Sequence, residues 1–227
     1  MSHVLDKFKF CPVCGSPNFE INNIKSKKCR DCGFSYYLNP SSATVAFILN
    51  DKEELLVVRR KNEPAKGTLD LPGGFVDMDE TGEEGVAREV KEETGLDAIE
   101  VNYQFSIPNL YLYSGFMVHT LDMFYTVKVK DLSHVEAMDD AEESYWIPLS
   151  ELHPEEFGLG SIKQGVTKFL AKHKTKEWKY APKHLKNQKN HYIIRYKQKV
   201  YLLLQTKRNC VEAYARKFSN RREPCKG

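Results

Sequence analysis

The sequence predicts an α/β fold, in which helices cover both sides of a mixed sheet and a small metal-binding module comes first. Between residues 41 and 173, runs of residues typical of strands alternate with two segments of helical periodicity. This strand-rich order with two helices suits a mixed sheet that is covered on both sides. Two pairs of cysteines precede the region. We therefore expect three parts, at residues 1–40, 41–171 and 172–227.

The cysteine pairs lie in the first of these parts. Two residues separate Cys11 from Cys14 and Cys29 from Cys32, and 14 residues lie between the pairs. A glycine follows each pair and permits the turn that directs two sulfurs at one ion. Four thiolates in tetrahedral array form a closed structural zinc site, so residues 8–38 resemble a zinc ribbon. Disulfides and a redox C-x-x-C are the alternatives, and disulfides are uncommon in a chain without a secretion signal.

Strand signals follow the cysteines. Residues 44–49 and 55–60 are rich in β-branched and apolar side chains and flank a polar turn, which predicts a hairpin. Residues 69–76 are typical of a strand that runs into a glycine turn. Further strands are expected at 99–105, 115–118, 122–129 and 145–147, and an amphipathic helix is expected at 160–172.

A first helix is predicted between the glycine turn and the next strand. Thr81 with Glu84 three residues later is a capping box, which satisfies exposed amides at a helix start. Gly95 is well placed to end the helix in a left-handed conformation. Val86 and Val90 mark a face suited to packing on a sheet.

Three glutamates of this helix share a different face. Glu89, Glu92 and Glu93 stand at i, i+3 and i+4. Like charges at this spacing repel by roughly 0.2–0.5 kcal/mol per pair in an isolated helix. Hard divalent cations with oxygen ligands compensate such repulsion, which predicts a metal site. The alternative is a solvated acidic face, which is the usual meaning of clustered glutamates.

Residues 74–96 also fit a longer pattern, G-x5-E-x7-R-E-U-x-E-E-x-G-U with U apolar, at all nine specified positions. This pattern resembles the signature of the Nudix hydrolases, which cleave nucleoside diphosphates linked to another moiety. The resemblance implies an α/β/α sandwich and Mg2+ or Mn2+ held by Glu89, Glu92 and Glu93. It also implies that Glu80 binds or supports the metal, and that Arg88 orients the glutamates by a salt bridge.

The turn at Gly73 and Gly74 has two interpretations. Glycines permit positive φ and close approach of the backbone, so in the first interpretation the pair is simply a tight turn. The resemblance implies the second, in which a backbone carbonyl of the turn joins the metal ligands and the loop holds the diphosphate.

A zinc ribbon in front of this pattern is similar to one branch of the family, the NADH pyrophosphatases. That branch carries S-Q-P-W-P-F-P-x-S after the pattern, where this chain reads SIPNLYLYS from Ser106 to Ser114. Both serines, the first proline and an aromatic at the sixth position agree. The glutamine, the tryptophan and the later prolines do not, and Asn109 stands at the tryptophan position. We expect a relative of that branch with a changed specificity loop, whose best substrate is not NADH.

Other residues are candidates for binding the substrate. Tyr111 and Tyr113 suit stacking on a base, and the alternative places one of them in the core. Arg59, Arg60 and Lys61 end a strand and suit phosphate contact, for which a bidentate guanidinium is well shaped. Exposed charges at a strand end are the commoner arrangement.

A second acidic cluster precedes the last strand. It comprises Asp139, Asp140, Glu142 and Glu143. The resemblance implies that a carboxylate of this region, Glu142 or Glu143, binds metal or activates water. An exposed polar loop is the equal alternative.

Charge divides the chain unevenly. Residues 172–227 hold 17 Lys and Arg but only 3 Asp and Glu, so their formal net charge is +14 against −11 for residues 1–171. Basic stretches with interleaved tyrosines can bind nucleic acid through phosphate neutralisation and stacking. An accessory or partly disordered extension is the interpretation that we favour.

These signals together predict an enzyme. No apolar run approaches the roughly 18 residues of a membrane span, and the first residues lack the apolar region of a signal peptide, so a cytoplasmic enzyme is expected. It should hydrolyse a phosphoanhydride bond in a small nucleotide, with NADH or NAD-capped RNA, ADP-ribose and nucleotide sugars as candidates. A homodimer is compatible with the sequence. The alternative is a non-catalytic nucleotide- or RNA-binding module that uses the ribbon and the basic tail, against which the intact Glu92 and Glu93 argue.

Overall fold

The computed structural model describes residues 3–132, 135, 141–180, 191–196, 199–205 and 211–214. For residues 141 and 142, and for residues after 173, only the backbone is described. The chain divides into two compact units, Met1–Ala171 and Lys172–Gly227. Each unit is described by itself.

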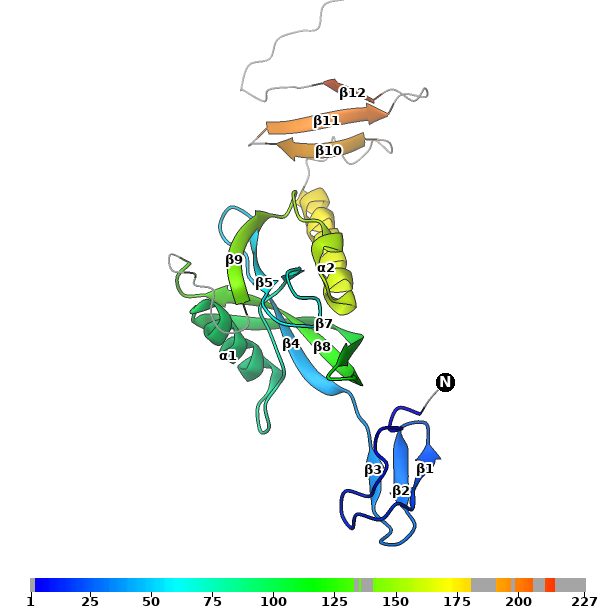
Figure 1. Cartoon of the computed structure of the whole chain (residues 1–227). Helices are drawn as coiled ribbons and strands as arrows, with labels where there is room; N and C mark the ends of the chain where they lie inside the picture. The colour runs from blue at the N-terminus through cyan, green and yellow to red at the C-terminus, as the bar shows by residue number, and fades with distance from the viewer. Residues whose placement is uncertain are drawn as a thin grey trace, which may run out of the picture. The chain divides into compact units, whose positions relative to one another are not determined.

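The first unit begins with a small three-stranded sheet (Figure 1). Its strands are antiparallel in the order β1 (Phe19–Asn23), β2 (Ser26–Cys29) and β3 (Ser35–Tyr37). Two cysteines, Cys11 and Cys29, are buried with Phe19 in its small core. A hydrophobic centre this small needs another source of stability, which the cysteines are placed to supply.

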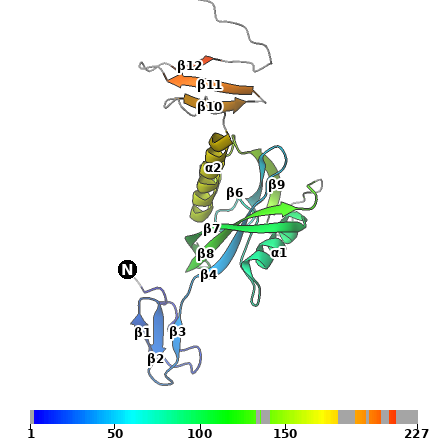
Figure 2. The same cartoon turned by 180° about the vertical axis from the view of Figure 1, so that it is seen from behind.

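Two further sheets belong to this unit (Figure 2). In the first sheet, β8 lies between β4 and β7; β8 pairs in parallel with β4 and antiparallel with β7. In the second sheet, β5 lies between β6 and β9 and is antiparallel to both. The elements are β4 (Ser41–Phe47), β5 (Glu54–Arg60), β6 (Leu69–Asp70), α1 (Gly82–Thr94), β7 (Ala98–Tyr113), β8 (Phe116–Val129), β9 (Ala141–Pro148), η1 (Pro154–Glu156) and α2 (Gly160–Tyr180).

Successive residues of the central strands point to opposite faces, and each face has its own helix. Val45 and Phe47 belong to a hydrophobic cluster that contains Val166 of α2. Ala46, between them, belongs to a second cluster that contains Val86 of α1. Strand periodicity therefore builds two cores back to back, and Figures 1 and 2 show α1 and α2 on opposite sides of the strands. The expected mixed α/β architecture is confirmed.

The predicted hairpin of residues 44–49 and 55–60 is wrong in its main pairing. Leu49 and Leu55 do form an antiparallel bridge across the turn. Beyond that bridge the two strands diverge, since β4 pairs in parallel with β8, and β5 pairs with β6 and β9. Each residue of β4 pairs with a residue of β8 that is 79 positions later in the sequence, so no local pattern reveals the pairing.

Residues 98–129 form one long antiparallel hairpin rather than three short strands. β7 and β8 pair from Ala98 and Val129 to Tyr113 and Phe116, and the turn has positive φ at Ser114 (49°) and Gly115 (72°). The segment expected as a specificity loop is therefore the end of β7. Its proline is tolerated because β7 is an edge strand of its sheet, where a missing N–H need not break a ladder.

The second unit contains a three-stranded antiparallel sheet. Its order is β10 (His191–Tyr196), β11 (Lys199–Gln205) and β12 (Val211–Tyr214). The apolar run at residues 200–204 lies within β11. Within the described residues, no helix is long and apolar enough to cross a membrane.

Helix α1 has the ends that its sequence predicts. The Thr81 hydroxyl accepts the backbone N–H of Glu84 at 3.2 Å, and the Glu84 carboxylate accepts the backbone N–H of Thr81 at 2.8 Å. The second bond lowers the pKa of Glu84, so this part of the cap is lost only in acid, as pH falls through the lowered pKa. Gly95 ends the helix with φ 72° and donates its N–H to Lys91.

Replacing the capping hydroxyl should destabilise the protein measurably. We expect Thr81→Ala to lower the free energy of unfolding by about 1 kcal/mol, because the first turn of α1 loses a hydrogen bond to its orphan amides. Urea unfolding at neutral pH would measure the loss. Thr167→Ala, at an exposed position of α2, is the control and should change stability by less than about 0.5 kcal/mol. An equal loss in both variants would contradict a special role for the cap.

Candidate active site

Arg88 of α1 gathers the carboxylates around it. Its Nε and Nη2 donate to the two oxygens of Glu80 at 2.9 and 3.0 Å. Its Nη1 donates to Glu89 and to Glu92, each at 2.9 Å, and Nη2 also reaches the carbonyl of Phe75 at 2.9 Å. The hydrogen bonds with Glu80, then those with Glu89 and Glu92, raise the pKa of Arg88 further. The same contact lowers the pKa of Glu80, so both groups are held in their charged forms.

Glu93 faces another partner. Its side chain is buried, with 7% of the residue exposed, and it accepts the backbone N–H of Gly73 at 3.1 Å. A buried carboxylate is costly unless donors or cations surround it. The glutamate face is thus divided, with two carboxylates on Arg88 and one against the glycine turn.

The glycine turn is crowded on two sides. A Cβ on Gly73, whose φ is +150°, would lie 2.1 Å from the backbone oxygen of Thr44 in β4. A Cβ on Gly74 would instead lie 2.4 Å from a carboxylate oxygen of Glu89. At Gly73 a side chain is excluded by backbone atoms. At Gly74 it is excluded by the flexible side chain of Glu89.

A cleft of about 430 Å³ opens beside this turn. Gly73, Gly74 and Glu93 line it at one place, and residues of the β7–β8 hairpin line it at another. Other parts of the wall come from β4, from β5 and β6, from the loop after β5 and from the start of α2; they include Thr44, Arg60, Asn62, Asp70, Leu159 and Ile162. A concave surface with carboxylates, a guanidinium and aromatic rings is the usual form of a small-molecule site.

The hairpin contributes one face to the cleft. Tyr111 lies opposite Val118 and Asn109 lies opposite Thr120 in the register of β7 and β8, and all four line the cleft. Tyr113, two residues beyond Tyr111, is on the same face because side chains alternate along a strand. The alternative that one tyrosine lies in the core is therefore wrong: Tyr111 is partly buried, Tyr113 is exposed, and both line the cleft.

The neighbouring arginines of β5 are placed differently. Arg60 lines the cleft and pairs with the buried Asp70, whose pKa is raised by burial and held back by this guanidinium. Arg59 is not part of the described lining. It donates to the carbonyl of Gly67 at 2.7 Å and lies 3.5 Å from Glu143. Lys61 is exposed and also lies outside that lining.

The second acidic cluster is only partly described. Asp139 and Asp140 lie outside the described residues, and Glu142 is described in backbone only, as part of β9. The carboxylate of Glu143 is directed at Arg59 rather than at the described lining of the cleft.

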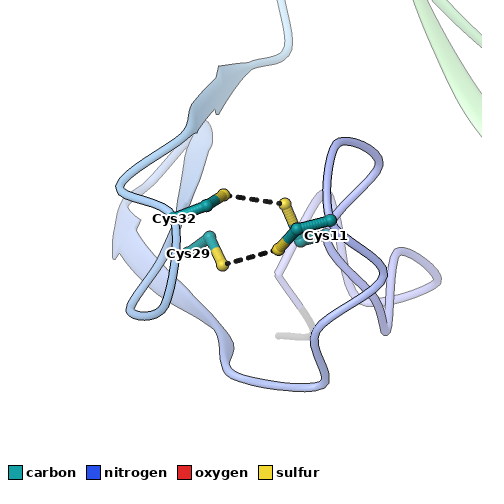
Figure 3. A group of neighbouring side chains, drawn as sticks. Cys11, Cys29 and Cys32 are labelled. Carbon is teal, nitrogen blue, oxygen red and sulfur yellow. Dashed lines mark hydrogen bonds between the residues drawn. The ribbon is translucent and has the colours of Figure 1, made fainter.

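The four cysteines converge next to the amino-terminal sheet. Figure 3 labels Cys11, Cys29 and Cys32. Two pairs of sulfurs, Cys11 with Cys32 and Cys14 with Cys29, are each 3.6 Å apart. Sulfurs on a tetrahedral zinc ion would be about 3.8 Å apart, given Zn–S bonds of about 2.3 Å. A hydrogen bond from the backbone N–H of Cys32, with another from Asp31, lowers the pKa of Cys29 to about 6. A backbone hydrogen bond at Ser16 lowers the pKa of Cys14, but the hydrogen bond with Cys32, desolvation and the hydrogen bonds with the other two cysteines together raise it to about 12. The cluster is compatible with zinc.

Within the described ranges, no other group of three potential ligand side chains has all its ligand atoms within 4.8 Å. Of the α1 carboxylates, Glu89 and Glu92 are held by Arg88, and Glu93 accepts from Gly73. Their chemistry nevertheless fits Mg2+ or Mn2+, because all are oxygen donors and a carboxylate that accepts one N–H can still ligate a cation.

Two cleft residues escaped the sequence interpretation. Asp70 and Asp122 are buried acids, exposed by 6% and 5%, and both line the cleft. Asp122 stands in an apolar run of β8, and Asp70 stands between two leucines. A charged residue in a strand that reads as buried is itself the signal that could have found them.

A family model described as the NUDIX domain matches residues 39–168. The chain belongs to the Nudix family. Its Nudix domain contains the cleft, the glycine turn and helix α1. The zinc-compatible cysteines lie before the matched residues.

Curated relatives resemble parts of this Nudix protein. The NAD-capped RNA hydrolase NudC of Vibrio atlanticus is 34% identical over 106 residues, which are 47% of this chain and 39% of that protein. The ADP-ribose pyrophosphatase of Methanocaldococcus jannaschii is 51% identical over 63 residues, which are 28% of this chain and 37% of that protein. The matches thus span less than half the length of these relatives.

A solved structure supports the fold. The crystal structure of a NUDIX hydrolase from Nitrosomonas europaea superposes with a TM-score of 0.58 at 21% identity, covering 74% of this chain and 93% of that one. At this identity the likeness establishes the architecture only.

The two glycines of the turn should respond differently to alanine. Gly73→Ala should lower the free energy of unfolding by more than about 1 kcal/mol, because backbone atoms of β4 block the new methyl group. Gly74→Ala should keep near wild-type stability but displace Glu89 and weaken Mn2+ binding. Thermal unfolding and calorimetric Mn2+ titration would measure the two effects. Equal stability of the two variants would show that the turn has more freedom than its contacts allow.

The cysteine cluster should hold one zinc ion. Cys11→Ser should release the metal and increase amide hydrogen exchange across residues 8–38, because this small sheet gains much of its stability from the ion. Elemental analysis and exchange mass spectrometry would measure both effects. Cys225→Ser, which keeps all four cysteines of the cluster, is the control. Carefully purified wild-type protein without zinc would overturn the assignment.

Proposed function

We propose that this protein hydrolyses the phosphoanhydride bond of a nucleoside diphosphate linked to another moiety. The observation that carries the proposal is that one cleft is lined by the glycine turn at Gly73, by the carboxylate of Glu93 in α1 and by an aromatic strand face at Tyr111. A diphosphate and a base need such neighbouring polar and aromatic surfaces.

The carboxylates of α1 form the reactive end of the cleft. Glu89, Glu92 and Glu93 would hold Mg2+ or Mn2+, with Glu80 in support. When bound, the cations neutralise charge on the diphosphate and lower the pKa of a water molecule. Arg88 orients the glutamates through the salt bridges that it makes with three of them.

Water adds across the phosphoanhydride, so each product keeps one phosphate. A carboxylate near the turn accepts the proton of the attacking water. Glu93 is the member of the glutamate face that lines the cleft, and the N–H of Gly73 fixes its orientation. Gly73 and Gly74 line the same cleft, so the backbone of the turn can approach the diphosphate closely.

Of the three basic residues considered for phosphate contact, Arg59, Arg60 and Lys61, we favour Arg60. Its guanidinium is in the lining of the cleft and is fixed by Asp70 and by the carbonyl of Pro64 at 2.8 Å. It suits a phosphate or ribose oxygen of the substrate. Tyr111 lines the same cleft, and its ring suits a base.

The substrate that we favour is an adenosine diphosphate derivative such as ADP-ribose, ahead of NADH. The two curated relatives act, by their names, on NAD-capped RNA and on ADP-ribose. Asn109 stands in the cleft at the position where the NADH pyrophosphatase motif has tryptophan, which removes a stacking surface. The cysteine cluster would bind structural zinc and take no part in the reaction.

A substrate screen tests this function directly. Purified protein would be incubated with ADP-ribose, NADH, nucleotide sugars, dinucleoside polyphosphates and nucleoside triphosphates, each with Mg2+ and with Mn2+, and the products identified by mass. Cleavage of an adenosine diphosphate derivative into two monophosphates supports the proposal. Cleavage of nucleoside triphosphates alone rejects it.

The reaction should depend on the glutamate face. Glu92→Gln and Glu93→Gln should each lower kcat/KM by at least about a hundredfold, because loss of a metal-ligating charge removes several kcal/mol of transition-state stabilisation. Glu83→Gln, at an exposed position of the same helix, is the matched control and should retain wild-type turnover. Circular dichroism would confirm that all three variants fold. Near wild-type turnover in both site variants would sink the assignment.

A further inference from the structure

The wall of the cleft contains a buried carboxylate that the proposed reaction does not use. Asp122 lies in β8 and is only 5% exposed. Its two oxygens accept the hydroxyls of Thr120 and Ser161, each at 2.5 Å. Both donors are neutral hydroxyls. They satisfy part of the hydrogen-bonding capacity of the carboxylate but do not neutralise its charge.

The surroundings of Asp122 change stepwise along the same strand face. Asp122 lies opposite the buried Ile107, and Thr120 lies opposite Asn109 one step further out. Tyr111 then follows towards the rim. The face therefore runs from an apolar core, through a polar floor, to an aromatic ring, and Asp122 is the innermost polar member.

Arg60 does not neutralise this acid in the way that it neutralises its neighbour. Asp70 accepts one hydrogen bond from Arg60 and another from the backbone N–H of Leu71 at 2.8 Å. Asp122 lies close enough that its charge, after burial, helps to raise the pKa of Asp70 and of Tyr111. The floor beneath Tyr111 is therefore an acceptor-rich surface.

A carboxylate has about four lone-pair positions, and the two hydroxyls use two of them. Asp122 can therefore accept a further donor from a molecule in the cleft, whose lining includes it. A planar ring against Tyr111 would bring its edge to this floor.

We propose that Asp122 determines specificity by accepting an N–H from an amino or amide group on the ring of the bound nucleotide. The inference rests on the proposed function and deepens it. Adenine and the carboxamide of nicotinamide carry such a donor. A ring with a carbonyl at that position would place its oxygen, an acceptor, against the Asp122 carboxylate, which is also an acceptor. A buried polar site discriminates strongly against such a ligand.

Two substrates that differ only in this group give the sharpest test. ADP-ribose carries the amino group of adenine, and inosine diphosphate ribose carries a carbonyl there. Both release ribose 5-phosphate, so one assay measures both. Wild-type protein should prefer ADP-ribose in kcat/KM by roughly tenfold or more, as expected for a hydrogen bond to a buried charged acceptor. No preference here, together with NAD+ cleavage that does not respond to Asp122→Asn, would overturn the proposal. The comparison of the two substrates needs no variant to fold.

Asp122→Asn replaces the acceptor by a group of the same size that can also donate. The preference for ADP-ribose should disappear or reverse, with the change mainly in KM. Ser161→Ala is the matched control, since it removes one partner of Asp122 but keeps the carboxylate. If Asp122 only ties β8 to α2, both variants should lose stability and both should keep the wild-type preference, which would overturn the proposal.

A ring other than adenine is distinguished by the same assay. NAD+ and nicotinamide mononucleotide-linked diphosphates test the amide donor, and UDP-glucose tests a base whose carbonyl stands in place of an amino group. Sensitivity of NAD+ but not ADP-ribose cleavage to Asp122→Asn would assign the carboxylate to the amide donor. If wild-type protein cleaves none of these diphosphates, the proposed function fails; if it cleaves them without regard to the donor, only the role of Asp122 fails.

Discussion

The contact between Arg88 and its carboxylates is the interaction on which the geometry of the candidate site depends. Three acids on one helix face repel one another, and a single guanidinium holds two of them together with Glu80 from the preceding loop. The same guanidinium reaches the carbonyl of Phe75, so it also fixes the chain that leads from the glycine turn into α1. The same guanidinium therefore fixes both the orientation of the acids and the position of the turn. A lysine could not replace this residue, because it lacks the planar fork that serves several acceptors at once.

The cleft owes its chemistry to the two-residue period of the β7–β8 hairpin. One face of the hairpin passes from Phe105 and Phe124 in the core to Tyr111 and Tyr113 at the rim. The opposite face of the same segment is exposed at Leu110. A single continuous surface therefore anchors the hairpin in the domain and presents polar and aromatic groups to a ligand. The edge position of β7 keeps this surface accessible, since no further strand of the described sheet covers it.

The sequence predicts best what local interactions decide. Both ends of α1 follow from Thr81 and Gly95, because a cap is formed by residues within one turn of the helix. The convergence of the cysteines follows from their spacing. The parallel pairing of β4 with β8 and the merging of three expected strands into one hairpin do not follow, because their partners are distant or their pairing overrides a proline. Within the site, the sequence does not distinguish Arg59 from Arg60. Successive side chains of β5 point to opposite faces, and the fold places the face of Arg60 at the cleft.

The crowding at the glycine turn has a genetic consequence. Position 73 is closed by main-chain atoms of β4, so no exchange of a neighbouring side chain can make room there. At position 74 the blocking atoms belong to the side-chain end of Glu89. Positions 74 and 89 should therefore vary together. A methyl group at 74 would be better accommodated beside the shorter aspartate at 89 than beside the natural glutamate. Selection for restored function in a strain carrying alanine at 74 should therefore yield second-site changes in α1, whereas alanine at 73 should yield only true reversion.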